Sequence, residues 1–243
     1  MRDCYHFLLL LLAANVPVAL HAQLDKQAQD PQLTNTISVF NSMVRDQSAL
    51  YNGSYYYRFP EYIHSGHPFF VSDKPAIGEV FYDGTLFKNV PLLYDERIDE
   101  LITYDYNKTN LLQLVKLKVN MFSIHGSHFI NVTDTHKAIP SGYYQLLYSS
   151  RSQVLSKEVK KVKTRIISQV EVNRSAETEN SRYARINGRY HMINGSKALM
   201  KLFGSHRNAV SDMMKGKKMK YKANPSSYIV EAVSYYDQLA ERK

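Results

Sequence analysis

From residue 78 onward, short β-rich stretches alternate with turn residues. Gly78–Tyr82 and Leu86–Val90 flank the pair Asp83-Gly84. Asp-Gly readily adopts the positive φ angles that a type I′ turn requires, and both flanking stretches are rich in β-branched and aromatic residues. The sequence therefore predicts a β-hairpin over residues 78–90, whose second arm Pro91–Tyr94 extends.

A second hairpin is predicted near the end of this region. Asn187-Gly188 separates Tyr183–Ile186 from Arg189–Ile193, again as a two-residue turn between two candidate strands. Val115, Leu117 and Val119 alternate with lysines, as expected for a half-exposed strand. Further strands are predicted at residues 101–104, 129–132 and 143–148. The middle of the chain is therefore expected to form an antiparallel sheet.

Residues 159–172 fit either a strand or a helix. Apolar residues alternate with basic ones, as in a half-exposed strand, but Val159, Val162, Ile166 and Val170 also lie on one face of a helix. Because β-branched side chains lose freedom in a helix and pack well in a sheet, the composition favours the strand.

The spacing becomes helical at the two ends of the chain. After Thr34, the residues Ile37, Phe40 and Val44 lie on one helical face, which predicts a helix that ends before Asn52. Near the C-terminus, three helices are predicted: one from Ser196 to Phe203, one around Val210–Met214, and one after Asn224-Pro225 whose apolar stripe runs from Ile229 to Leu239.

These elements predict an α+β fold, because the strands are grouped first and the helices last. The expected protein is an antiparallel β-rich body with an N-terminal helix and a C-terminal group of two to three helices. The predicted organisation has four parts: a signal peptide over residues 1–22, a polar tether over 23–33, the helix and β body over 34–195, and a basic helical segment over 196–243 packed on the body.

The N-terminal leader predicts export. Phe7–Leu20 is almost continuously apolar, and Ala22-Gln23 offers a cleavage point after a small residue. The run is shorter than the roughly 20 residues that a spanning helix needs, and no second long apolar run follows, so no transmembrane span is expected in the mature chain. We expect the protein in the periplasm, at the outer membrane or outside the cell.

Composition adds two constraints. The single cysteine, Cys4, lies in the leader, so the mature chain has no disulfide and no cysteine metal ligand. Residues 1–150 carry 11 Lys/Arg and 14 Asp/Glu, a net charge of −3, whereas residues 151–243 carry 20 and 8, a net charge of +12. This asymmetry indicates either simple solubility or an anionic partner. Export disfavours nucleic acid and favours an anionic envelope component: a lipid headgroup, a polysaccharide or an acidic protein.

Two groups of basic residues are candidates for such a partner surface, provided that they share a face. We expect each lysine near an anionic membrane to contribute on the order of 1 kcal/mol. The candidates are Lys161, Lys163, Arg165, Lys215, Lys217, Lys218, Lys220 and Lys222.

Several motifs resemble a family of uncharacterised exported proteins of Bacteroidota. They are Leu50-Tyr-Asn-Gly53, Gly66-His-Pro-Phe-Phe70, Gly78 through Phe81-Tyr-Asp-Gly84, Asn89-Val-Pro-Leu-Leu-Tyr-Asp95 with Asp99, Ser196 through Phe203, and Tyr235-Tyr236-Asp237. The resemblance spans nearly the whole mature chain. It implies export and a shared fold, and it carries no activity, ligand or catalytic residue.

The histidines offer a candidate metal site. His64 and His67 are three residues apart, as are His125 and His128, and two such pairs can supply zinc ligands if the fold brings them together. Both pairs lie in Gly/Ser-containing loops, and no glutamate lies between the members of either pair to act as a base. The pattern therefore favours turn histidines without a metal, with the metal site as the alternative.

The carboxylates Asp95, Glu96, Asp99 and Glu100 form the other candidate for chemistry, as calcium ligands or as an acid–base pair. The segment lacks the regular alternation of oxygen ligands that a calcium loop needs, which favours a solvated acidic turn. Tyr55, Tyr56, Tyr57 and Tyr62 suit either a binding surface or sheet packing.

Known catalytic signatures are missing from the sequence. There is no Gly-x-Ser-x-Gly nucleophile elbow, no phosphate-cradling glycine loop and no dinucleotide fingerprint, so no cofactor is expected. The leading hypothesis is a non-catalytic envelope protein that binds an anionic surface or protein partner. The alternative is a secreted metal-dependent or acid–base hydrolase that uses the four loop histidines or the Asp95–Glu100 cluster.

Overall fold

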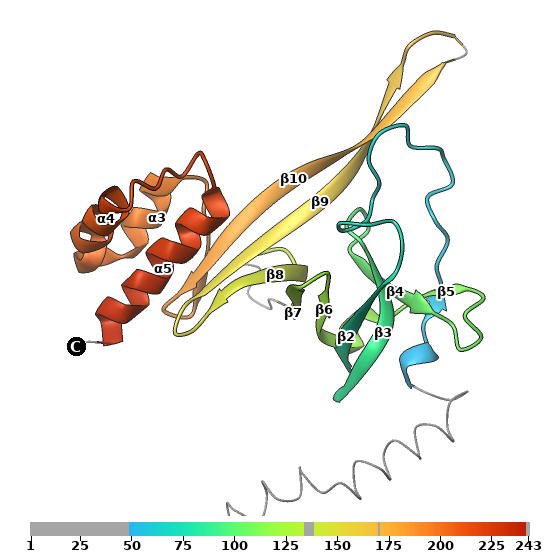
Figure 1. The fold of residues 1–243 in the computed structure, drawn as a ribbon, viewed down its shortest axis with the longest axis horizontal. Coiled ribbons are helices and arrows are strands. Elements are labelled where there is room, and N and C mark those ends of the chain that lie inside the picture. The colour runs from blue at the N-terminus through green and yellow to red at the C-terminus, as the bar shows by residue number, and fades with distance from the viewer. Residues whose placement is uncertain (1–48, 134–138, 170, 242–243) are drawn as a thin grey trace, which may run out of the picture. The chain divides into compact units, whose positions relative to one another are not determined.

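The computed structural model describes residues 49–133, 139–169 and 171–241 (Figure 1). The predicted signal peptide, the tether and residues 34–48 of the predicted N-terminal helix lie outside the described residues. The residues from Ala49 onward belong to one compact unit.

Within that unit, eleven described strands form one sheet in which every paired strand runs antiparallel to its neighbour. The order across the sheet is β1-β5-β4-β3-β2-β6-β7-β8-β9-β10-β11. The strands are β1 Ser54–Tyr55, β2 Ala76–Tyr82, β3 Thr85–Asp95, β4 Glu100–Tyr104, β5 Leu111–Gln113, β6 Val119–Ile124, β7 Ser127–Val132, β8 Gly142–Ser149, β9 Gln153–Ile166, β10 Val172–Ile186 and β11 Arg189–Met192. β1 and β11 are therefore the two edge strands.

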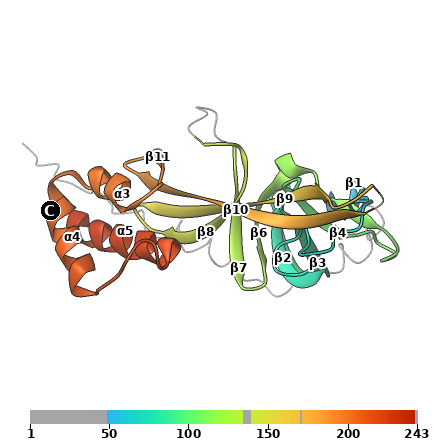
Figure 2. The same ribbon diagram turned by 90° about the horizontal axis from the view of Figure 1, so that it is seen from above.

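The helices of the described residues follow the sheet. They are α3 Ser196–Leu202, α4 Arg207–Gly216 and α5 Pro225–Glu241, with 3₁₀ turns at η2 Ala49–Tyr51, η3 Lys116–Lys118 and η4 Gly204–His206. Figure 2 shows the three α-helices gathered at the end of the sheet that contains β8, β10 and β11.

The predicted α+β class is wrong, because the eleven-stranded sheet dominates the described residues and no N-terminal helix is seen there. Among the residues from Ala49 onward that the structure describes, only the turn η2 precedes β1, and the α-helices come after residue 195. The sheet grows this large because most strands pair with their neighbour in sequence through a short connection: β6 to β11 form one continuous meander, and β2 to β5 form another.

Both predicted hairpins are confirmed. Asp83 and Gly84 have φ angles of 50° and 79°, and Asn187 and Gly188 have 51° and 79°, as a type I′ turn requires. The strand predicted for the ambiguous segment is also confirmed over 159–166, although the chain then turns and β10 begins at Val172. The strand predicted over 115–119 is wrong, because Lys116–Lys118 form η3 and β6 begins only at Val119.

A hydrophobic core joins the helices to the sheet. Val154 and Ala184 of the sheet pack in one buried cluster with Phe203, Ile229 and Val233 of the helical segment. A carboxylate reinforces this contact, because Asp237 of α5 accepts hydrogen bonds from the hydroxyl of Ser152 at 2.7 Å and from its backbone N–H at 2.9 Å. The predicted apolar stripe of α5 is therefore the face that the sheet covers.

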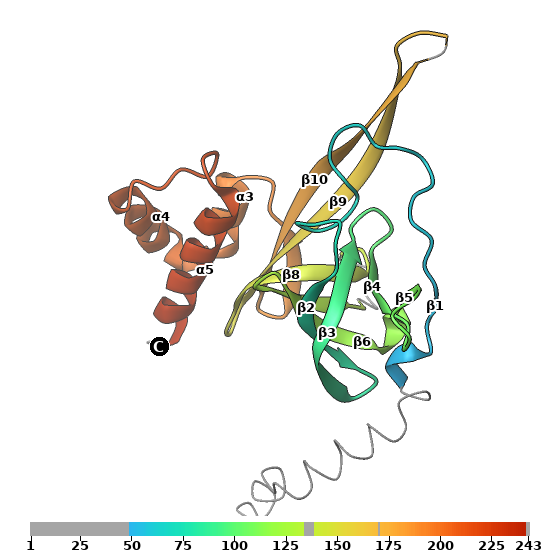
Figure 3. The same cartoon turned by 45° about the vertical axis from the view of Figure 1, so that its right-hand side comes forward.

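Beyond Ser156, β9 leaves β8 and pairs with β10 alone, which makes a two-stranded ribbon (Figure 3). Two loops hold this ribbon. The backbone N–H of Lys160 donates to the carbonyl of Glu96 at 3.3 Å, and the N–H of His64 donates to the carbonyl of Arg174 at 2.9 Å.

Candidate functional site

Asp95 is a fully buried carboxylate at the end of β3. Its Oδ2 accepts a hydrogen bond from the Tyr56 hydroxyl at 2.7 Å, and its Oδ1 accepts the backbone N–H groups of Arg97 at 2.9 Å and Ile98 at 3.3 Å. Burial and this hydrogen bond raise the pKa of Tyr56 well above its ordinary value. The bonds to Arg97 and Ile98 close the turn after β3, so Asp95 has a structural role.

The side chain of Asp99 joins β3, the turn η3 and β9. Its Oδ1 accepts the Tyr94 hydroxyl at 2.7 Å, and its Oδ2 lies 2.7 Å from Nζ of Lys116 and 3.0 Å from Nζ of Lys157. Burial lowers the pKa of Lys157, whereas the Asp99 charge acts in the opposite direction. Because both carboxylate oxygens are occupied, this cluster is best described as a structural ion network that ties the β3–β4 turn to β9.

Glu96 is the unusual member of the acidic turn. Its side chain is only 2% exposed, its Oε2 has no hydrogen-bond partner in the described part of the chain, and Nζ of Lys160 lies 3.8 Å away. Burial, with the charge of nearby Glu158, raises the pKa of Glu96 to about 7. So little of Glu96 reaches the surface that a substrate has no access to it.

The solvated acidic turn favoured by the sequence is therefore wrong, because Asp95 and Glu96 are buried. Burial also raises the pKa of Glu100. Among the described residues, no three or more His, Cys, Asp or Glu side chains gather in a way that could hold a metal ion. Neither a calcium site nor an accessible acid–base pair finds support at Asp95–Glu100.

The segments Leu50–Gly53, Gly66–Phe70, Gly78–Gly84 and Asn89–Asp95 contain residues with structural roles. A Cβ on Gly53 would lie 1.9 Å from the carbonyl oxygen of Gln113, and one on Gly78 would lie 2.2 Å from that of Ser123. Only glycine allows these close approaches of two backbones. The β-bridge between Phe69 and Asp95 joins two of these segments.

The four loop histidines do not form a cluster with metal-binding geometry in the described residues. His64 Nδ1 accepts the backbone N–H of Arg174 at 3.2 Å, so this histidine fastens its loop to β10. His67 Nδ1 accepts the N–H of Phe69 at 3.2 Å within its own turn. His125 forms the β6–β7 turn with φ of 51°, and His128 lies on β7.

The eight candidate basic residues lie in two separate segments of the fold. Lys161 and Lys163 lie on the ribbon and pair with Glu179 and Glu177 of β10. The other group lies in and after α4, where Lys215 pairs with Asp212 and Lys217 pairs with Glu231. No ion pair is seen in the described residues for Arg165, Lys218, Lys220 and Lys222.

The two basic groups lie at different ends of β9. The helices pack on β9 near Val154, and Arg165 is eleven residues further along the strand, or roughly 35 Å at the rise of an extended strand (Figure 1). That the two groups form one partner surface stays a prediction.

The tyrosine-rich segment is divided between surface and core. Tyr56 is buried, whereas Tyr55, Tyr57 and Tyr62 are exposed. The sheet-packing interpretation therefore holds only for Tyr56, and a binding role for the three exposed rings stays a prediction.

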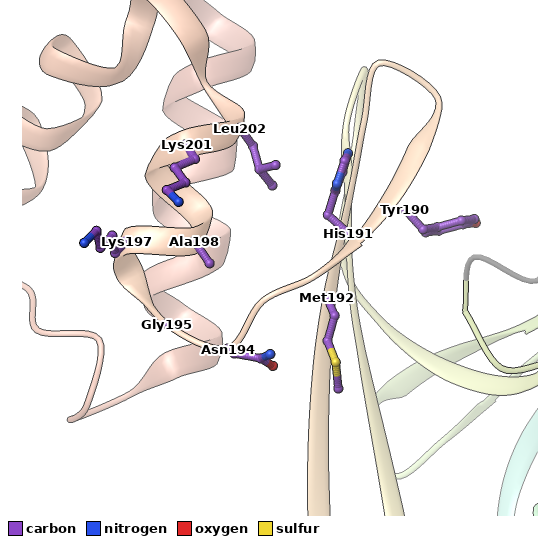
Figure 4. A pocket seen from close by; sticks show the side chains of 9 residues that line it. All are labelled: Tyr190, His191, Met192, Asn194, Gly195, Lys197, Ala198, Lys201 and Leu202. Atoms are coloured by element: carbon purple, nitrogen blue, oxygen red, sulfur yellow. The ribbon is translucent and has the colours of Figure 1, made fainter.

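A groove between β11 and α3 is the best candidate for binding (Figure 4). Its volume is about 750 Å³, within the range of about 300–1,000 Å³ that is usual for ligand sites. We call it the β11–α3 groove. It is lined by Tyr190, His191, Met192, Asn194, Gly195, Lys197, Ala198, Lys201 and Leu202.

The edge of β11 contributes free backbone groups to this groove. In the antiparallel β10–β11 hairpin, every second opposed pair of residues is hydrogen-bonded, beginning with Ile186–Arg189 next to the turn and continuing with Ala184–His191. The N–H of Ile193, which donates to the carbonyl of Arg182, continues this alternation. The alternate residues of β11, Tyr190 and Met192, therefore point their N–H and C=O groups away from β10. No backbone partner for them is seen in the described residues.

The facing helix contributes charge. Lys197, Ala198, Lys201 and Leu202 line the groove on one side of α3, while the opposite side of the helix, with Leu199, packs into the core. Neither Lys197 nor Lys201 has an ion-pair partner in the described residues, and no carboxylate lines the groove. Like charges four residues apart destabilise a helix by about 0.2–0.5 kcal/mol, so this pair does not serve the stability of α3.

The sequence offered a weak signal for this site. Lys197 and Lys201 stand four apart in a predicted helix, directly after a predicted hairpin. The interpretation of the basic region relied instead on the longer run at Lys215–Lys222. The free edge of β11 depends on the strand order, which no local pattern shows.

Comparison of the chain with family models, curated proteins and solved structures gives no match. No helix in residues 49–133, 139–169 and 171–241 combines the length and the apolar character needed to cross a membrane.

Proposed function

We propose that this protein is an exported, non-catalytic binding protein whose β11–α3 groove binds an acidic polypeptide segment in an extended conformation. The observation that carries the proposal is the outer edge of β11, which pairs with no strand of the described residues. This edge borders a groove lined by two lysines that have no ion-pair partner in that part of the chain, and by no carboxylate. The apolar leader at Phe7–Leu20 supports the export part of the proposal.

The free edge favours a polypeptide over the other anionic partners. An added strand pairs its own N–H and C=O groups with those of Tyr190 and Met192, and these main-chain bonds provide affinity. Lipid headgroups and polysaccharides carry no such row of peptide groups. Since β11 has only four residues, we expect the paired segment to be about four residues long.

The lysines of α3 provide selectivity. A carboxylate on the added strand would approach the ammonium groups of Lys197 or Lys201, which have no competing partner in the described residues. Charge complementarity of this kind raises the association rate and disfavours cationic partners.

Fluorescence anisotropy with a labelled eight-residue peptide of alternating glutamate and valine tests the proposal. We expect binding that weakens as salt rises, because lysine–carboxylate attraction is screened beyond roughly 8 Å at physiological ionic strength. The double variant Lys197→Gln/Lys201→Gln should weaken binding. The matched control Lys161→Gln/Lys163→Gln, on the ribbon, should leave it unchanged.

Met192→Pro tests strand addition separately from charge. Its N–H points away from β10, so proline removes a donor at the free edge while the β10–β11 pairing stays intact. We expect this variant to fold and to lose the peptide. Unchanged binding by Met192→Pro, or equal binding of a lysine–valine peptide, would refute the proposal.

A further inference from the structure

A row of apolar side chains crosses the sheet face opposite the one on which Val80, Phe122 and Phe129 belong to a buried cluster. Cross-strand pairing aligns Leu86 with Phe81, Phe81 with Met121, and Met121 with Ile130. Directly opposed residues share a sheet face, so these four side chains lie side by side across β3, β2, β6 and β7. Leu86 is 47% exposed and Met121 is 50% exposed.

A second row lies next to the first, two residues along each strand. Here Glu79 pairs with Ser123, and Ser123 pairs with His128. Because side chains alternate between faces with a period of two, these polar groups lie on the same face as the apolar row. One face thus carries an apolar row beside a polar row.

A pocket joins the two rows. It has a volume of about 280 Å³, and Phe81, Leu86, Met121, Ile130 and Leu146 supply its apolar wall, with Glu79, Ser123 and His128 beside them. A cavity of about 150 Å³ holds a benzene molecule, so this pocket has room for a short alkyl chain or one ring. We call it the Met121 pocket.

Glu79 determines the charge that suits the pocket. Its side chain is exposed and has no ion-pair partner in the described residues, and no lysine or arginine lines the pocket. An apolar wall with an unpaired carboxylate at its side is complementary to a molecule with an apolar body and a cationic end.

We propose that the Met121 pocket binds a single-chain amphiphile whose head group is a protonated amine, with its alkyl chain along Phe81, Met121 and Ile130 and its ammonium group toward Glu79. The pocket is lined by residues of β2, β3, β6, β7 and β8, whereas β11 and α3 line the β11–α3 groove, so no residue belongs to both sites and this proposal does not rest on the function proposed above.

Calorimetric titration tests this site, with decylammonium and decanoate below their micellar concentrations and decanol below its solubility limit. We expect decylammonium to bind one to one and to shift the Met121 methyl signal in a ¹³C–¹H spectrum. Decanoate should bind at least about tenfold more weakly, because its charge is repelled by Glu79. The strand-edge variant Met192→Pro should bind decylammonium normally, which separates this site from the groove.

Two variants and one control give the proposal its quantitative test. Glu79→Gln should weaken decylammonium binding about fivefold, because a favourable exposed ion pair contributes about that factor in affinity. It should leave decanol binding unchanged. Met121→Thr, which keeps β propensity but removes apolar surface, should weaken both about tenfold. Ile77→Ser, on the same strand but outside the pocket, should leave binding unchanged.

Three results would overturn the proposal. The first is equal binding of decanoate and decylammonium, and the second is binding that neither Glu79→Gln nor Met121→Thr alters. The third is a concentration-dependent dimer that Met121→Thr dissociates, because a second copy would then cover this face.

Discussion

Replacing Glu96 with glutamine should stabilise the protein above neutral pH. The Glu96 side chain is 2% exposed, and burial together with the charge of Glu158 raises its pKa to about 7. The ammonium group of Lys160, 3.8 Å away, offsets only part of this effect. Glutamine keeps the shape of the side chain and removes the charge.

The direction and size of this change in the free energy of unfolding follow from proton linkage. The unfolded chain releases the Glu96 proton near its ordinary pKa of 4.5, whereas the folded protein holds it up to about pH 7. Between these values the folded state binds more protons, so the free energy of unfolding falls as pH rises and then levels off above pH 7. At 1.36 kcal/mol per pKa unit the loss is at most roughly 3 kcal/mol.

Urea unfolding followed by circular dichroism at pH 5, 6, 7 and 8 measures this effect. We expect the stability of Glu96→Gln minus that of wild type to rise across the series and to reach about 1–3 kcal/mol at pH 8. The control Glu179→Gln removes an exposed carboxylate paired with Lys161, and it should change stability by less than about 1 kcal/mol. A difference that stays constant from pH 5 to pH 8, or a Glu96→Gln variant that is less stable at pH 8, would refute the reasoning.

Three further predictions concern the structural roles of single side chains. Asp237→Ala should lower the free energy of unfolding by about 2–4 kcal/mol, because it leaves the buried Ser152 hydroxyl and N–H unpaired; a smaller loss in thermal unfolding would contradict the anchoring role of Asp237. Asp99→Asn should lower the free energy of unfolding by about 2–4 kcal/mol, because Lys157 is largely buried and loses its counter-charge. The double variant Asp99→Asn/Lys157→Met should recover part of this lost stability. Gly142→Ala should lower the melting temperature by roughly 5–10 °C, because a Cβ there would lie 2.0 Å from Oδ2 of Asp99 at a φ of 139°; a melting temperature within about 1 °C of wild type would show that the site relaxes freely.

Local chemistry in the sequence was sufficient to predict the turns and several of the elements. Asp83-Gly84 and Asn187-Gly188 prefer positive φ angles whatever surrounds them, so both hairpins were predictable. The stripe from Ile229 to Tyr236 was predictable because a helix repeats every 3.6 residues, and the structure buries that face.

Only the tertiary structure determined which charged groups are buried and which groups they contact. Alternation at Val115–Val119 predicted a strand, but there the chain makes a 3₁₀ turn in which the side chain of Lys116 contacts Asp99. The carboxylates of the acidic turn were expected in solvent, but Asp95 and Glu96 are buried because distant residues such as Tyr56 and Lys160 cover them.

The candidate sites depend in the same way on the order of the strands. Sequence indicates that Arg189–Met192 is a strand, but whether its outer edge is paired depends on which strands lie beside it. The apolar row at Phe81 and Met121 likewise exists only because β2 and β6, which are separated by about 40 residues, pair in one register. Local dihedral preferences determined the elements, and long-range pairing determined which of their groups were left free to bind.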